Sequence, residues 1–136
     1  MLLLVLVLIG GAIGFQALRS DDGGLGGGSS CDLAVKAHQR VETIKAGRSI
    51  PTSADYGESA LAIRKVAVTA STQVAPFLHA IADAYGQLST YFRGFDPADE
   101  ATYSIVELHT AEIERQQVLV DQADAGLLTW LDRSCR

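Results

Sequence analysis

The chain has 136 residues, of which 48% are hydrophobic, and its 16 acidic and 11 basic side chains give a net charge of −5. This length allows one domain with a single core, and the apolar content is typical of a folded protein. Binding to a phosphate backbone requires concentrated lysine and arginine. The acidic balance without a basic cluster therefore excludes nucleic acid as a partner.

The N-terminal segment is strongly apolar, and its first charged residue is Arg19. As a helix, residues 1–18 would extend about 27 Å, which is just enough to cross the hydrocarbon core of a bilayer. We therefore expect residues 1–19 to form a transmembrane anchor, or an uncleaved signal, that binds the chain to the membrane.

Three alternatives remain open for this segment. A cleaved signal peptide would require small residues before the cut, and Gly10 with Ala12 is the only fair match. A lipid-modified Cys31 fits poorly, because Gly28 stands where a lipidation signal carries a branched apolar residue. A buried helix of a globular protein is the third alternative.

A glycine- and serine-rich stretch separates the apolar segment from the rest of the chain. Residues 20–30 have the composition of a flexible linker that holds the following domain near the membrane. The domain, residues 31–136, has one cysteine at each end, Cys31 and Cys135, and none between. This placement predicts a disulfide and hence an extracytoplasmic domain. The positive flank at Arg19 favours the opposite topology, with a cytoplasmic domain.

Helical periodicity runs through the domain. Apolar residues at positions 34, 37, 41 and 44 mark the buried face of a first helix, which ends before Pro51. A second stripe continues from Ile63 to Tyr91, after a capping-box-like pair at Asp55 and Glu58. Pro76 falls inside that stripe, and because the stripe stays in phase across it we expect a kink rather than a break.

A further helix is predicted from a start signal at Asp96 and Pro97 to the C-terminus, with a break near Gly126. No segment shows the alternation and turn chemistry of strands. We therefore predict an all-α fold, an antiparallel bundle of three or four helices closed by the disulfide. Straight helices would place the two cysteines at different heights, so the pairing needs a bend or break in one of them.

No catalytic, metal or cofactor site is predicted. The histidines at positions 38, 79 and 109 fall one on each predicted helix, but His79 points away from its apolar stripe and His109 lies on a flank, so we expect no convergence on a metal ion. The acidic residues Asp83, Glu107, Glu112 and Glu114 occupy faces that helices give to water. The chain is therefore not expected to be an enzyme.

Aromatic residues concentrate around the expected turn near Gly94. Phe92, Phe95 and Tyr103 are a candidate partner surface at one tip of the bundle, because exposed aromatic rings often anchor protein interfaces. The sequence thus favours a membrane-anchored extracytoplasmic helical interaction module, an accessory subunit of a membrane or envelope complex. A ligand- or metal-binding extracytoplasmic sensor is the alternative, and a cytoplasmic adaptor with inverted topology is the second.

Overall fold

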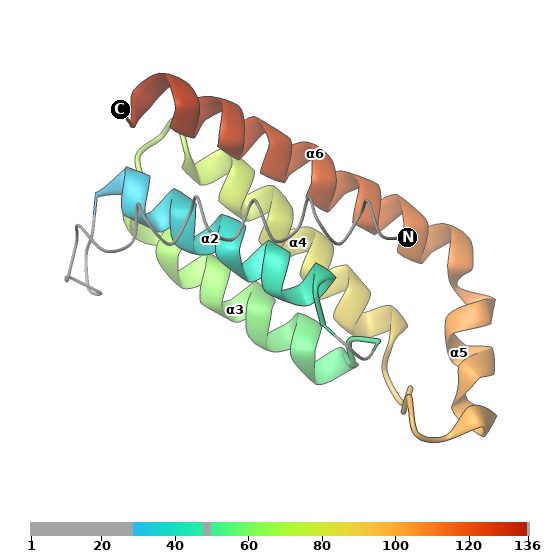
Figure 1. Ribbon diagram of the computed structural model, residues 1–136. Coiled ribbons are helices and arrows are strands. Elements are labelled where there is room, and N and C mark those ends of the chain that lie inside the picture. The colour runs from blue at the N-terminus through green and yellow to red at the C-terminus, as the bar shows by residue number, and fades with distance from the viewer. Residues whose placement is uncertain (1–28, 48–49, 136) are drawn as a thin grey trace.

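The computed structural model describes residues 29–47 and 50–135. Their helices are, in chain order, α2 (Ser30–Lys45), α3 (Ser53–Thr69), α4 (Ala75–Tyr91), the 3-10 turn η1 (Glu100–Thr102), α5 (Tyr103–Leu108) and α6 (Thr110–Ser134). The four long helices form a bundle in which consecutive helices run in opposite directions (Figure 1). The predicted all-α bundle is confirmed for this part of the chain, which contains no strand.

The anchor predicted for residues 1–19 lies outside the described residues, as does the linker except for its last two residues. Among the helices that are described, none combines the length and the apolar character needed to cross a bilayer.

The first bundle helix, α2, begins where the sequence predicted. The Ser29 side chain caps it by accepting a hydrogen bond from the backbone N–H of Asp32. The expected apolar face is buried, with Ala34, Ala37 and Val41 each no more than 2% exposed. α2 packs against α3 on one side and α6 on the other.

The chain reverses direction near Pro76, so the predicted kink is wrong. α3 ends at Thr69, Ala70 adopts an extended backbone with ψ 155°, and α4 starts again at Ala75. Pro76 lies in the first turn of α4, where the N–H that proline lacks would have no helical partner. The two halves of the stripe are buried by different helices, because α3 and α4 pack against each other as an antiparallel pair.

The start of α3 uses different capping residues from those expected. Thr52 is the N-cap, and it forms a reciprocal capping box with Asp55, whose carboxylate accepts from the Thr52 N–H at 2.8 Å. Glu58 is exposed and lies one turn further on.

The connection between α4 and α6 is longer than predicted. Gly94 has a φ of 85°, which favours glycine, and ends the turn after α4. Asp96 does not start a helix but caps a turn by accepting from the Ala98 N–H, and η1 begins only after the next cap, Asp99. The short α5 that follows buries none of its residues and lies at the end of the bundle opposite the C-terminus (Figure 1).

Helix α6 continues unbroken past Gly126, contrary to expectation. A Cβ atom added at Gly126 would come within 2.5 Å of the Phe77 ring on α4. The glycine therefore allows close packing between two helices instead of ending one. The fully buried side chains of the core come from all four long helices and from the α3–α4 turn; the largest are Val41, Ile63, Val74, Leu78, Ile81, Leu88 and Leu127.

Candidate functional site

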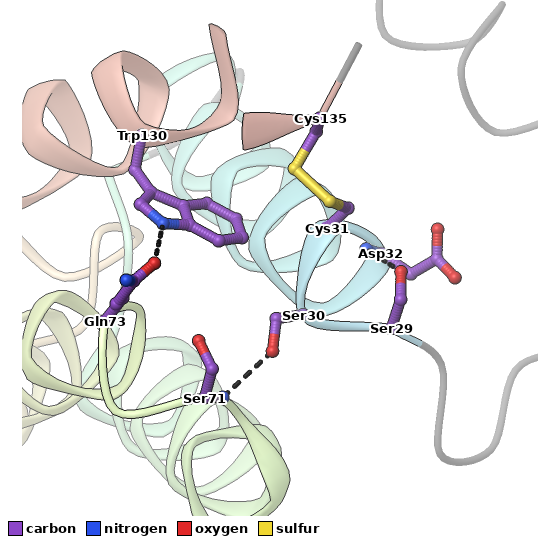
Figure 2. Close-up of a disulfide and its surroundings, with 8 residues drawn as sticks. All are labelled: Ser29, Ser30, Cys31, Asp32, Ser71, Gln73, Trp130 and Cys135. Atoms are coloured by element: carbon purple, nitrogen blue, oxygen red, sulfur yellow. Dashed lines mark hydrogen bonds between the residues drawn. A yellow bond between two sulfur atoms is a disulfide. The ribbon is translucent and has the colours of Figure 1, made fainter. Parts of the chain in front are cut away.

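The two cysteines meet at one end of the bundle, as the sequence predicted. The Sγ atoms of Cys31 and Cys135 are 2.08 Å apart, a bonding distance, and their Cα atoms are 5.8 Å apart. Figure 2 shows this contact joining the first turn of α2 to the end of α6. The reversal before Pro76 makes it possible, because a fourth helix brings the chain back to the end where it began.

Polar contacts surround the cysteines (Figure 2). The backbone N–H of Ser71, in the turn between α3 and α4, donates to the Ser30 hydroxyl at 2.9 Å. The Trp130 indole N–H on α6 donates to the Gln73 amide oxygen at 3.1 Å. The start of α2, the α3–α4 turn and the last turns of α6 are therefore joined at one end of the bundle.

The predicted aromatic partner surface needs correction. Phe92, Phe95 and Tyr103 do lie together, with ring centroids 5.6 Å apart in each consecutive pair. Phe92 and Phe95, however, are only 3% and 7% exposed, because they belong to the core, where Phe92 packs against the ring of Tyr56. Tyr103 is 37% exposed, and its hydroxyl donates to the Pro97 carbonyl. Two of the three rings belong to the core and are not offered to a partner.

Other apolar side chains are exposed instead. Leu108, at the end of α5, is 77% exposed, and Val68, near the end of α3, is 81% exposed. Leu61 on α3 and Val118 on α6 are 61% and 52% exposed. Leu108 lies at the end of the bundle that carries α5, here called the α5 tip, whereas Val68 lies at the opposite end, near the cysteines. Substitutions at these two exposed positions can therefore compare the two ends of the bundle.

The three histidines have different surroundings. His79 is exposed on α4, and His109 is half-buried against the Tyr91 ring at a centroid distance of 5.1 Å. His38 is different, because it is only 5% exposed and faces α6. Its Nδ1 lies 2.8 Å and 3.0 Å from the two carboxylate oxygens of Asp124, which is itself 4% exposed.

A polar cluster surrounds this buried pair. Glu42 follows His38 by one helical turn, and ligand atoms of His38, Glu42 and Asp124 all lie within 4.8 Å of one another. Next to them, Lys45 forms an ion pair with Asp121 at 2.6 Å. Burial opposes the charge of Lys45, but the hydrogen bond to Asp121 and the neighbouring carboxylates outweigh it and raise the lysine pKa.

Two tyrosines lie beneath the cluster in the core. Burial is the main reason why the pKa of Tyr85 is raised far above its usual value, and Tyr56 and the carboxylates of Asp124, Asp121 and Glu42 add to the effect. Burial also raises the pKa of Tyr56. Both phenols are therefore held neutral next to a concentration of negative charge.

The sequence interpretation missed Asp124, although a signal was present. Asp124 is four residues after Val120 and three before Leu127, so it falls within the apolar stripe of its helix. His38 has the same relation to Ala34 and Val41. A histidine in one apolar stripe and an aspartate in another, which can carry opposite charges, indicate a buried pair of polar side chains.

Comparisons with protein-family models, with curated proteins and with solved structures found no significant match to this chain. The functional argument therefore depends only on the arrangement of the chain's own residues.

Proposed function

We propose that the chain is a membrane-tethered extracytoplasmic interaction module, an accessory subunit that presents a helical bundle to a protein partner. The observation that carries the proposal is the bonding distance between Cys31 and Cys135. Disulfides persist in oxidising compartments and are rare in the cytosol. An apolar segment ahead of such a bundle is typical of an exported protein that stays attached to the membrane.

The shape of the bundle supports a partner contact at the α5 tip. The linker joins the bundle at Ser29, and the 25 residues of α6 extend away from that end by about 37 Å. The tip carries Leu108 and Tyr103, which are 77% and 37% exposed. We infer that α5, with no buried residue of its own, is available to a partner at the far side of the bundle from its attachment.

Topology is tested by labelling thiols in intact cells. We expect no reaction of either cysteine with a maleimide before reduction, and a faster-migrating non-reduced form on a denaturing gel. Two free thiols that only a membrane-permeant reagent reaches would contradict the proposal and favour the cytoplasmic adaptor.

The partner is tested by co-purification of the full chain from mild detergent. We expect a stoichiometric partner that is lost with Leu108→Asp and retained with Val68→Asp. The two variants are matched, because both replace a strongly exposed aliphatic side chain with a carboxylate and neither removes a buried contact. A chain that purifies alone, or that loses its partner equally with both variants, would contradict an α5 contact.

A further inference from the structure

The polar cluster between α2 and α6 has the composition of a metal-binding site. His38 and Glu42 are four residues apart on α2 and therefore share one face of the helix. Asp124 approaches the same point from α6, and the ligand atoms of all three residues lie within 4.8 Å of one another. The ligands of a tetrahedral zinc ion lie about 2.0 to 2.2 Å from it and therefore about 3.4 Å from each other. Ion binding would therefore widen the 2.8 Å contact between His38 and Asp124 slightly and draw the more distant ligand atoms together.

We propose that His38, Glu42 and Asp124 bind one divalent transition-metal ion, with Zn²⁺ as the best-fitting species. One imidazole nitrogen and two carboxylates suit a borderline ion of this class, and two negative charges balance its charge. The ion replaces the proton in the hydrogen bond between His38 Nδ1 and Asp124, and that proton moves to the other ring nitrogen or to solvent. Three protein ligands leave a fourth position for water or an external ligand.

The charges around the cluster favour a cation. Asp121 adds a third carboxylate on the same side, and the buried phenol of Tyr85 is held neutral beneath it. Lys45 is the competing positive charge, but its side chain is 41% exposed and is paired with Asp121, not with a proposed ligand. The Lys45 side chain can turn to solvent when an ion enters, and the Asp121 carboxylate then remains to offset the charge of the ion.

The consequence for the bundle is a second link between α2 and α6. The cysteines join these helices at their ends, whereas His38 lies about two turns from Cys31 along α2 and Asp124 about three turns from Cys135 along α6. An ion at this position would fix α2 against α6 along its length, in addition to the covalent contact at one end. This role goes beyond the proposed partner binding and does not depend on it.

The experiment uses the full chain in detergent, stripped with a chelator and then dialysed against Zn²⁺ or titrated with Co²⁺. We expect one tightly held ion per chain and a Co²⁺ absorption band of four- or five-coordinate geometry. Glu42→Gln should weaken the affinity at least tenfold, and His38→Gln should do the same while keeping a hydrogen-bond donor for Asp124. Circular dichroism verifies that each variant is helical.

His79→Gln is the matched control, because it removes an exposed imidazole that belongs to no cluster of the described residues and should leave binding unchanged. Glu42→Gln keeps the test valid if His38→Gln does not fold, because it leaves the His38–Asp124 pair intact. Absence of binding by the parent chain would overturn the proposal and leave the cluster as a buried ion pair only. Binding that survives Glu42→Gln, or that is lost with His79→Gln, would overturn it as well.

Discussion

Removal of the cysteine link should be the most destabilising change at the ends of the bundle. The double substitution Cys31→Ser with Cys135→Ser opens a loop with a sequence separation of 104 residues and leaves no thiol behind. In the chain-entropy model, closing a loop of this length lowers the entropy of the unfolded chain by an amount worth about 4.7 kcal/mol at 25 °C. Small domains have a net stability of about 5 to 15 kcal/mol, so the loss is a large share of the total.

The magnitude can be measured by urea unfolding of the full chain in detergent, followed by the helical signal in circular dichroism. With a urea dependence of about 2 kcal/mol per molar, the midpoint should fall by roughly 2 M. The reduced parent chain should unfold together with the double-serine variant. A variant within about 1 kcal/mol of the oxidised parent would refute the reasoning, because the loop would then not restrict the unfolded chain.

Two further predictions concern the buried polar residues. Asp124→Ala removes the carboxylate that contacts the buried His38 and should lower the free energy of unfolding by about 3 kcal/mol. Asp121→Ala, at an exposed ion pair, should change it by less than about 1 kcal/mol. Equal effects of the two variants in urea titrations would contradict the buried pair. Because burial raises the pKa of Tyr85 in the folded state, the unfolded chain loses this proton first as the pH rises. The contribution of Tyr85 to stability is therefore fully present below about pH 10 and falls by about 1.4 kcal/mol per pH unit above it. Tyr85→Phe should make that decline shallower, and an unchanged slope in unfolding series between pH 9 and 11 would count against this origin.

Much of the fold could be predicted from the sequence, because helical periodicity reports burial directly. The apolar positions of α2 and the terminal cysteines were identified correctly, and each depends only on local spacing or on placement in the chain. The reversal at Pro76 was not, since a stripe that stays in phase fits both one kinked helix and two antiparallel helices. The cysteine pairing could have distinguished these two arrangements, because it requires the C-terminal end of the chain to return to the end of the bundle where α2 begins.

The candidate sites were harder to predict for a different reason. Phe92 and Phe95 were assigned to the surface because they flank a turn, yet the core extends to that end of the bundle and covers them. Gly126 was taken as a helix breaker, although its role depends on the Phe77 ring of another helix. The partnership of His38 with Asp124 spans 86 residues. Contacts of this kind depend on how helices are arranged, which spacing along one helix does not report.

The cysteine contact also determines how the bundle responds to mechanical load. A pull on the chain ahead of Cys31 is transmitted through the sulfur bridge to Cys135, at the end of the longest helix, and not along the backbone of α2 alone. With the bridge intact, α2 cannot be peeled away turn by turn from its first residue. A pull applied between this end and α5 would instead act along the axis of α6, so it would load the backbone hydrogen bonds of that helix.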